Sequence, residues 1–395
     1  MISLTSALQL IAADPLGSES VPLDLTAGRI LSQHLVAEWD QPPFDAAAMD
    51  GYALRADPTC MHRLIVGESA AGHPFHSRID ATQCVRISTG AALPAGADAV
   101  ILQEDADTQN GVLVSPAAHG GVYVRPRASD FAAGDVVLRA GTVLSPGAVT
   151  LAAATGAALL RVRRQPRIAV VSIGDELVTP GATLERAQIF DSASYGVAAL
   201  AGAWGAVVKR HSIVPDTREA IASAMREVYE ESDVIVSIGG ASAGPHDHVR
   251  AALDSPEFES RFSSVAIKPG KPTWFGYFRG LPLLGLPGNP ASALVCARLF
   301  LCPLIEKRLG RDDGDALRTQ AAFAAEDLDA GGTREEFVRA IVTSGGDGFL
   351  DVRKAGRQDS SLSSSLAASN ALVWRPAVAP QTRTGEPVPF LSWLR

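Results

Sequence analysis

The 395-residue sequence has few cysteines, no excess of positive charge and no long hydrophobic run. Its cysteines show no C-x-x-C spacing, so free and mostly buried thiols in a reducing cytoplasm are expected at Cys60, Cys84, Cys296 and Cys302. The net charge of −8 argues against a general nucleic-acid binder, which needs a basic surface. The longest apolar stretch, residues 148–160, is shorter than the roughly 20 residues of a membrane span, and the N-terminus lacks the basic segment of a signal peptide. We therefore expect a soluble cytoplasmic protein with neither a membrane segment nor a nucleic-acid partner.

The sequence also lacks the common nucleotide-binding motifs. Neither G-x-x-x-x-G-K-[ST] nor G-x-G-x-x-G is present, which argues against a P-loop ATPase or a dinucleotide fold of the usual kind. Residues 240–244 match the G-x-S-x-G elbow of serine hydrolases, but the last histidines, His246 and His248, lie too close to Ser242 to complete a triad built from a distant loop. A glycine loop that positions a ligand is the favoured interpretation.

Three apolar runs, each ending in a turn rich in glycine, predict the central fold. The runs and their turns are 168–173 with Gly174-Asp175-Glu176, 233–238 with Gly239-Gly240, and 283–286 with Pro287-Gly288-Asn289-Pro290. Helices are expected at 195–204, 218–231 and 292–309, with a further strand at 207–214. This alternation predicts a doubly wound, mostly parallel α/β sheet, which binds ligands at the carboxyl ends of its strands.

The regions before and after this predicted sheet have a different pattern of apolar residues. Apolar residues at helical spacing predict helices around residues 4–11 and 23–35, and Ser145 with Pro146 predicts the start of a helix that reaches residue 160. Short strands are expected at 63–66, 84–88 and 99–102, and again at 336–342, 349–352 and 371–374. The chain is thus expected to contain a small β-rich domain near its start and a C-terminal β-barrel or sandwich.

Two acids are candidates for a metal site. Glu176 and Asp247 follow neighbouring predicted strands, and hard oxygen ligands suit Mg²⁺ that is shared with ligand phosphates. The alternative is that each is a solvated loop acid. His246 and His248, which flank Asp247, are weak evidence for zinc because no second Cys/His cluster accompanies them.

Three further loops carry candidate residues. Lys268 and Lys271 lie in a proline-stiffened turn that could present cations to phosphate, although a solvated surface turn is about as well supported. Asp50, Thr89 and Asp130 lie in loops around the small β-rich domain, and each signal is weak by itself.

Together these motifs resemble the molybdopterin molybdenumtransferases, the MoeA family that includes the E domain of gephyrin. Residues 43–53 resemble the family's PFDNSAMDGYA, 89–100 its TGAPLPxGADAV, 173–177 its TGDEL and 239–247 its GGVSVGDYD; 268–272 and 286–292 match outright, and 357–370 is similar to a late serine-rich loop. The resemblance covers nearly the whole chain in order.

The resemblance implies a fold, a reaction and a set of site residues. It implies a helical dimerisation domain (1–51 and 138–165), an inserted β-rich domain (52–137), an α/β molybdopterin-binding domain (166–312) and a C-terminal β-barrel domain (313–395). It implies that adenylated molybdopterin and molybdate give molybdenum cofactor and AMP, with Mg²⁺ at Glu176 and Asp247. A homodimer with a site shared between subunits is implied as well, and other proteins of cofactor biosynthesis are possible partners. The catalytic positions carried over are Asp50, Thr89, Asp130, Glu176 and Asp247. The substrate-binding positions are Ser172, Gly174, Asp175, Ser237, Gly239, Gly240, Ser242, Gly244, Lys268, Lys271, Pro287, Gly288, Asn289, Pro290 and Ser292.

Several positions depart from the family pattern. Hydrogen-bonding or acidic residues of the family are replaced here by Ala46, Ala47, Ser129, Ile173, Ala193 and Ile238. The five catalytic positions are kept. A divergent, non-catalytic molybdopterin- or nucleotide-binding paralogue, or a scaffold in the manner of gephyrin, is therefore an alternative to the enzyme.

Overall fold

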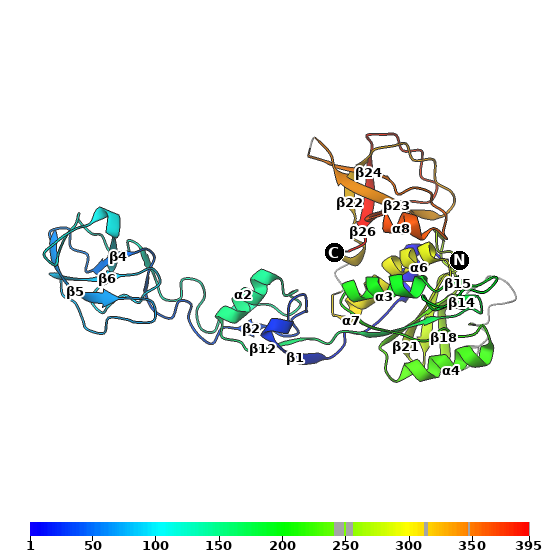
Figure 1. The fold of residues 1–395 in the computed structure, drawn as a ribbon, viewed down its shortest axis with the longest axis horizontal. Coiled ribbons are helices and arrows are strands. Elements are labelled where there is room, and N and C mark those ends of the chain that lie inside the picture. The colour runs from blue at the N-terminus through cyan, green and yellow to red at the C-terminus, as the bar shows by residue number, and fades with distance from the viewer. Residues whose placement is uncertain (241–248, 250–255, 312–314, 347, 395) are drawn as a thin grey trace. The chain divides into compact units, whose positions relative to one another are not determined.

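The computed structural model describes residues 1–240, 249, 256–311, 315–346 and 348–394 (Figure 1). The chain forms two compact units, which we describe separately: residues 1–19 with 163–395, and residues 20–162. No helix in the described ranges is long and apolar enough to cross a membrane. All four cysteines are free, and only Cys60 is not fully buried, as the sequence indicates.

A six-stranded mixed sheet is the centre of the first unit. Its strand order is β16 (Val207–Arg210), β13 (Arg167–Ser172), β17 (Val234–Ile238), β21 (Leu281–Leu286), β20 (Trp274–Phe278) and β18 (Phe258–Phe262). The first four strands are parallel, which agrees with the predicted pattern. The last two pairings, β21 with β20 and β20 with β18, are antiparallel and were not predicted. Because the four strands are parallel, their carboxyl ends and the turns that follow lie at one edge of the sheet.

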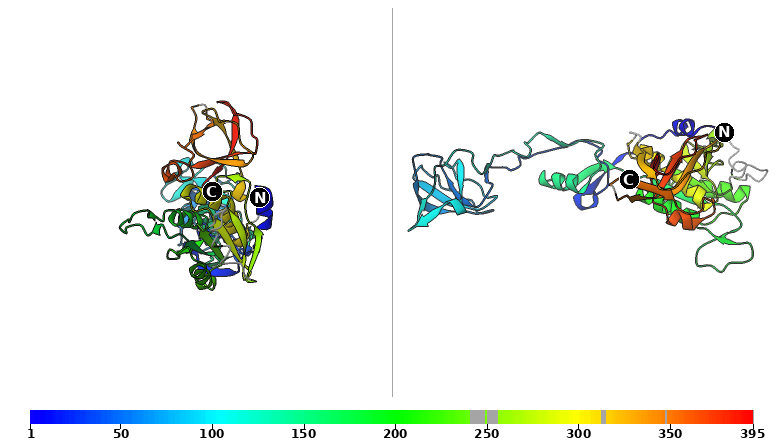
Figure 2. Two further views of the ribbon diagram at one scale, coloured as in Figure 1. Left: turned by 90° about the vertical axis from the view of Figure 1, so that its right-hand side faces the viewer. Right: turned by 90° about the horizontal axis from the view of Figure 1, so that it is seen from above.

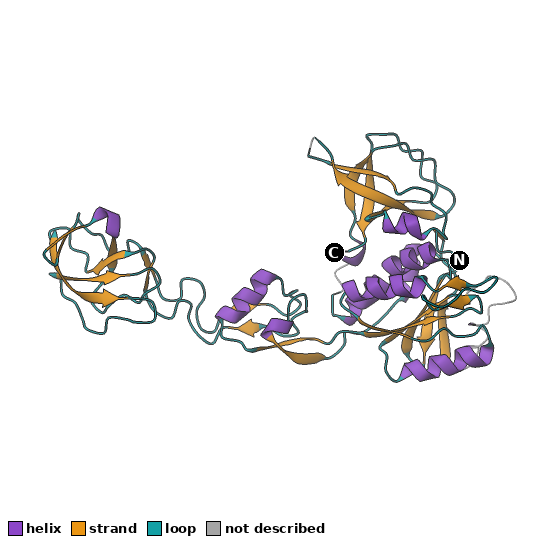
Figure 3. Cartoon of the chain, viewed as in Figure 1, coloured by secondary structure: helices purple, strands orange, loops and turns teal. Residues whose placement is uncertain are grey.

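Helices cover both faces of this sheet (Figures 1 and 3). On one face α4 (Arg218–Tyr229) is capped by the Thr217 hydroxyl and buries Ile221 and Met225 against strand residues such as Val171. On the other face lie α3 (Ala193–Ala203) and a continuous helical run made of α6 (Pro290–Cys296), the π-helical segment η3 (Ala297–Leu301) and α7 (Cys302–Arg308). The predicted closing helix is therefore present but contains a π-helical turn.

The C-terminal strands of the same unit form a second sheet, drawn in orange and red in Figure 2. The order is β19 (Ile267–Lys268), β23 (Glu335–Ser344), β24 (Leu350–Lys354), β22 (Gln320–Ala324), β26 (Pro387–Ser392) and β25 (Ala371–Arg375), with η4 (Asp315–Leu317) before β22 and α8 (Ser363–Ala367) before β25. An additional β23–β25 pairing closes the sheet on itself, which leaves few free strand edges. The pairing of β19 with β23 fixes the main chain at Lys268 against this barrel.

Short elements also fix the ends of this unit. Helix α1 (Leu4–Leu10) begins at Ser3, whose hydroxyl accepts a hydrogen bond from the Ser6 N–H. The short strands β14 (Leu177–Val178) and β15 (Ile189–Phe190) pair in parallel beyond the end of β13.

The second unit is mostly β-structure. A six-stranded sheet has the order β7 (Ala99–Leu102), β4 (Gly51–Leu54), β6 (Gln83–Ile87), β5 (His62–Ser69), β9 (Val112–Val114) and β8 (Asp107–Gln109), and η2 (Gln103–Asp105) follows β7. Three two-stranded pairs accompany it: β3 (Ala46–Ala47) with β10 (Val124–Arg125), β2 (Leu35–Val36) with β11 (Val136–Leu138), and β1 (Ser18–Pro22) with β12 (Leu159–Arg163). The predicted strands at 63–66, 84–88 and 99–102 are present in this sheet.

Two helix predictions in this region need correction. The segment 23–35 is not helical: it contains a short turn, η1 (Leu23–Leu25), then bridges from Ile30 and Leu31 to other strands, then β2. Its apolar residues pack into a core built from short strands, and the spacing that produces this core also fits a helix. The helix α2 (Pro146–Ala154) starts at Ser145 as predicted but ends early, because Gly156 adopts φ +82° and the chain turns into β12.

Candidate active site

A cavity of about 820 Å³ lies at the carboxyl ends of the parallel strands. The turns after β13, β17 and β21 all line it, through Gly174, Glu176, Gly239, Gly240 and residues 287–290. The structure thus brings together three loops that are far apart in the sequence. Ser242, Gly244 and Asp247, which belong to the same predicted site, lie outside the described residues.

Glycine is required where these loops approach one another. At Gly239 φ is +88°, and a β-carbon there would lie 2.3 Å from the main-chain oxygen of Ile173. A β-carbon on Gly288 would lie 3.5 Å from the Gly239 α-carbon, so the turns after β17 and β21 are also in contact range. Any side chain at Gly239 would therefore separate the strand-end turns that form the cavity wall.

Among the described residues, three carboxylates line the cavity: Glu176, Asp191 and Asp216. Asp191 is buried and accepts hydrogen bonds from the hydroxyls of Ser172 (2.8 Å) and Ser194 (2.6 Å). Asp216 has a buried Oδ1 atom that has no hydrogen-bond partner among the described residues. An unpartnered carboxylate oxygen in a polar cavity is a suitable ligand for a hydrated cation or a ligand hydroxyl.

Asp191 and Asp216 are site residues that were not predicted from the sequence. Asp216 follows the predicted strand at 207–214, so its position after a strand could have indicated a site residue. Asp191 comes after the short strand β15, which carries little sequence signal. Among the described residues there is no group of three or more His, Cys, Asp or Glu side chains arranged to hold a metal ion.

Three predicted substrate-binding residues, Ser172, Asp175 and Ser237, line neither this cavity nor the second cavity described below. Ser172 and Ser237 are buried within the sheet, where Ser172 holds Asp191. The Asp175 carboxylate instead accepts a hydrogen bond from the Asp216 N–H at 3.0 Å. Through these contacts Ser172 and Asp175 support the acids of the cavity rather than forming its wall.

A second cavity of about 680 Å³ adjoins the first, because both are lined by Pro272, Pro287 and Asn289. Ser292 lies in its wall. Its basic lining residues are Lys268, Lys271, Arg334, Arg339, Lys354 and Arg375, and its acids are Asp329, Glu336 and Asp359. The excess of cations makes it suited to an oxyanion in a chain that is negatively charged as a whole.

Arg339 is the most deeply buried cation of this second cavity. Its side chain is 1% exposed, and Nη2 donates to the main-chain oxygens of Arg357 (3.1 Å) and Asp359 (2.9 Å). Nε and Nη1 have no hydrogen-bond partner in the part of the chain that the structure describes, and burial lowers the pKa of the guanidinium. Two fixed, unsatisfied N–H groups beside a cavity form a preorganised anion site that the sequence analysis does not identify.

The serine-rich loop 359–363 connects the two cavities. The Asn289 side chain donates to the Ser360 hydroxyl at 3.0 Å, and the Ala291 N–H donates to the Ser360 main-chain oxygen at 3.1 Å. Ser360 lines the basic cavity, and Ser361 and Ser363 line the acidic one. Lys268 is partly neutralised by Glu336 at 3.1 Å, whereas no ion pair is present at Lys271 among the described residues.

In the second unit the structure brings together Asp50 and Thr89. One oxygen of the Asp50 carboxylate accepts from the Thr89 N–H (2.6 Å) and hydroxyl (2.9 Å), and these hydrogen bonds lower the pKa of Asp50. Asp130 lies on a separate loop, held by its N–H to the Gln41 oxygen at 2.9 Å, and no hydrogen bond among the described residues joins it to Asp50. Asp50 is thus ionised and fixed at neutral pH.

The departures from the family pattern fall in two places. Ile173, Ala193 and Ile238 all border the acidic cavity and are nearly buried. The Ile173 side chain also packs with Val214 and other core residues beneath α4, so it lies between the cavity and the core. Ala46 and Ala47 are buried in β3, where they pair with β10, and Ser129 lies in the loop before Asp130.

Comparisons with known proteins cover almost the entire chain. Residues 2–156 match the MoeA N-terminal region (domain I and II), 169–307 a probable molybdopterin binding domain, and 321–393 the MoeA C-terminal region (domain IV). The molybdopterin molybdenumtransferase of Haemophilus influenzae is 33% identical over 363 residues, which are 91% of this chain and 90% of that protein. The enzyme of that name from a Nostoc species is 34% identical over 373 residues, with 91% and 85% covered.

Solved structures agree with these matches. A molybdopterin biosynthesis MoeA protein from Pyrococcus horikosii superimposes with a TM-score of 0.84 at 27% identity, and the match covers 100% of both chains. A second structure of the P. horikoshii OT3 protein gives a TM-score of 0.82 at 26% identity. Sequence identity above 30% over nine-tenths of the chain, together with the same fold over its full length, establishes the relationship. The chain belongs to the molybdopterin molybdenumtransferase family.

Proposed function

We propose that this protein completes the molybdenum cofactor by inserting molybdate into adenylated molybdopterin with release of AMP. The observation that carries the proposal is the adjoining pair of cavities, one acidic at the strand ends and one basic around Arg339. The reaction needs to hold a nucleotide-linked pterin and a tetrahedral oxyanion side by side, and two cavities with shared walls supply such places. The relatives carry the name of the enzyme, and none of the comparisons supports the alternative of a non-catalytic paralogue.

The acidic cavity would take adenylated molybdopterin. The turns at Gly174, Gly239, Gly240 and 287–290 are suited to phosphate and pterin edges, because glycine lets a ligand approach the backbone closely. Ser242 and Gly244 would extend the same wall. Ser172, Asp175 and Ser237 would act by supporting these turns.

Mg²⁺ would be held by Glu176 and Asp247. The described part of the site fits this ion, since Glu176 lines the cavity together with Asp216, whose Oδ1 has no hydrogen-bond partner. When bound, Mg²⁺ would neutralise pyrophosphate charge and help orient the attacked phosphorus. Glu176 and Asp216 are the acids that would face the bound ligand.

Molybdate, the second substrate, would bind in the basic cavity. Arg339 would donate its unpartnered Nε and Nη1 groups, and Lys271, which lines the same cavity, would add an ammonium group. Lys268 and Ser292 would complete the lining. The oxyanion would then lie next to the cavity that takes the pterin.

The second unit would complete the site in a homodimer. We propose that the fixed carboxylate of Asp50, with Thr89 and Asp130, positions the incoming oxyanion or a water, and that the site is shared between subunits. The division into domains 1–51 with 138–165, 52–137, 166–312 and 313–395 belongs to the same proposal. So do the cytoplasmic location and contact with other proteins of cofactor biosynthesis.

A reconstituted reaction tests the function. Purified protein is incubated with adenylated molybdopterin, Mg²⁺ and molybdate, and AMP release is measured by chromatography. We expect release that needs all three components. Tight binding of adenylated molybdopterin with no AMP release at saturating Mg²⁺ and molybdate would favour the non-catalytic paralogue.

A further inference from the structure

Asp50 and Asp130, which the proposed function places in one site, lie on separate loops of the second unit. The Asp130 loop, residues 126–133, packs against residues 40–45. That segment leads directly into β3, which precedes Asp50 by three residues. The contacts between the Asp130 loop and residues 40–45 therefore determine where the two acids lie relative to each other.

Main-chain hydrogen bonds join the two segments. The Ala128 N–H donates to the Pro42 oxygen at 3.0 Å, and the Asp130 N–H donates to the Gln41 oxygen at 2.9 Å. Gln41 also forms an antiparallel bridge with Phe131. At Ala128 φ is +60°, a conformation that favours glycine. A loop that holds an alanine in this conformation needs further contacts to keep its shape.

Arg127 supplies the side-chain contact between the segments. Its Nε pairs with one oxygen of the Asp40 carboxylate, and its N–H donates to the Asp45 carboxylate at 2.8 Å. The other Asp40 oxygen accepts a hydrogen bond from the Ala133 N–H at 2.8 Å. Arg127 thus contacts both ends of the 40–45 segment, and Asp40 contacts both ends of the Asp130 loop.

The two partners of this ion pair differ in exposure. The Asp40 side chain is 14% exposed and the Arg127 side chain 66%. Hydrogen bonds from Ala133 and then from Arg127 lower the pKa of Asp40, so its carboxylate is ionised at neutral pH. An ion pair with so exposed an arginine adds little to the stability of the unit. A displacement of about 1 Å in a catalytic group, by contrast, can lower a rate by about a hundredfold.

We propose that Arg127 is a positioning residue of the transferase reaction. Through its pair with Asp40 it fixes the Asp130 loop on residues 40–45, and so sets the position of Asp130 relative to Asp50. The inference rests on the proposed function, which assigns both acids to one site. Arg127 acts through the loop and makes no contact with substrate.

Hydrogen exchange tests this role independently of activity. The N–H groups of Ala128, Asp130 and Ala133 all donate to residues 40–42. In Arg127→Gln they should exchange at least about fivefold faster than in the parent, because the loop opens more often. The Thr89 N–H, which donates to Asp50, should be unchanged. Arg127→Lys keeps a cation for Asp40 and should retain most of the protection. Exchange that is identical in the parent and Arg127→Gln would overturn the proposal.

Steady-state AMP release tests the consequence for the reaction. Arg127→Gln and Asp40→Asn should each lower kcat at least about tenfold and leave KM for both substrates within about twofold. Asp40→Asn keeps an acceptor for the Ala133 N–H. The double variant should be no slower than either single variant, because both remove the same pair. A raised KM in Arg127→Gln but not in Asp40→Asn would mean that the guanidinium contacts substrate, and would overturn the proposal.

Arg78→Gln is the matched control. Arg78 is an exposed arginine of the same unit and forms no ion pair within the part of the chain that the structure describes. Its replacement should change neither exchange nor kcat. A parent protein that releases no AMP would contradict the proposed function, whereas the exchange measurement would still decide whether Arg127 holds the Asp130 loop.

Discussion

Single residues decide how the two active-site cavities differ in charge. Arg339 keeps two N–H groups open in the basic cavity, whereas Asp216 keeps a carboxylate oxygen open in the acidic one. Both are buried polar atoms without partners, which cost free energy in the absence of a ligand. A ligand in the adjoining cavity would supply the missing partner, and this is why both atoms are assigned to ligand binding in the proposed function.

Arg339→Gln should therefore impair use of molybdate. A hydrogen bond to a charged group contributes about 1.5–3 kcal/mol, and 1.4 kcal/mol corresponds to a tenfold change. Loss of one or two such bonds predicts a KM for molybdate at least tenfold higher, with a smaller change in affinity for adenylated molybdopterin. Steady-state AMP release over a molybdate series measures this. Arg353→Gln, an exposed site on β24, is the control and should be indistinguishable from the parent.

Ile173→Thr, which restores the family's residue, should destabilise the protein rather than improve ligand binding. The side chain packs in the core beneath α4, so a hydroxyl there would be buried without an evident partner, at a cost of about 1–3 kcal/mol. Urea denaturation should show a lower midpoint, and KM for adenylated molybdopterin should be unchanged. A lower KM with unchanged stability would show that the hydroxyl reaches the ligand. Val207→Thr, at a 53% exposed position on β16 that lines neither candidate active-site cavity, is the control.

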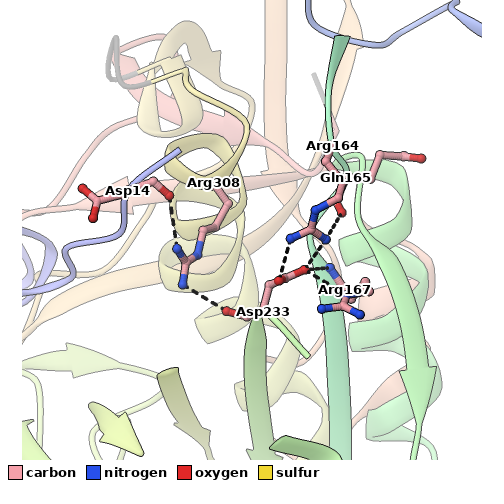
Figure 4. A network of polar contacts seen from close by, with 6 residues as sticks. All are labelled: Asp14, Arg164, Gln165, Arg167, Asp233 and Arg308. Atoms are coloured by element: carbon pink, nitrogen blue, oxygen red, sulfur yellow. Dashed lines mark hydrogen bonds and ion pairs between the residues drawn. The ribbon is translucent and has the colours of Figure 1, made fainter. Parts of the chain in front are cut away.

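At the scale of elements, the buried residue Asp233 connects the beginnings of β13 and β17 with the end of α7 (Figure 4). The Asp233 carboxylate accepts two hydrogen bonds from Arg164, both at 2.8 Å, and one from the Arg167 N–H at 2.8 Å. Arg308 of α7 donates to the Asp233 main-chain oxygen at 3.1 Å and to the Asp14 oxygen at 3.1 Å. The network thus connects β13, β17, α7 and the N-terminal segment.

This network predicts a specific acid sensitivity. Burial raises the pKa of Asp233, but hydrogen bonds from Arg164 and Arg167 outweigh it and bring the pKa to about 2, below the ordinary 3.8. A depressed folded pKa means that the stabilisation, roughly 2 kcal/mol, is complete above about pH 4 and is lost as the pH falls toward 2. Asp233→Asn should be less stable at pH 7 and should lose this part of the pH dependence in urea denaturation. An unchanged slope between pH 4 and 2 in the variant would refute the assignment.

Some of these elements could be predicted from the sequence and others could not. Strands β13 and β17 were predictable because continuous apolar runs end in glycine turns, which a strand in a parallel sheet requires. The region 23–35 was misassigned because short strands around a small core give the same apolar spacing as a helix. The site loops after strands were predictable for the same reason as the strands. Arg339 and Asp191 were not, because their roles depend on long-range contacts with the 357–359 loop and Ser172.

At the scale of the whole molecule, the proposed homodimer predicts how mixed dimers of two inactive variants behave. If Asp50 and Asp247 of one site come from different subunits, mixed dimers of an Asp50→Ala chain and an Asp247→Ala chain contain one intact site and one doubly altered site. We expect about half the parent AMP release per dimer, although each homodimeric variant is inactive. Differently tagged chains and tandem affinity purification give verified mixed dimers. Mixed dimers as inactive as the two homodimers would instead indicate sites built within one chain.

In the proposed reaction, AMP release is coupled to molybdate insertion. The most direct test measures both products of one reaction: AMP by chromatography and pterin-bound molybdenum by elemental analysis of the isolated cofactor. We expect equimolar AMP and inserted molybdenum in the parent, and strongly reduced amounts of both in Glu176→Gln. AMP released without molybdenum in the pterin would contradict the account, because it would make the protein a hydrolase of adenylated molybdopterin rather than a molybdenumtransferase.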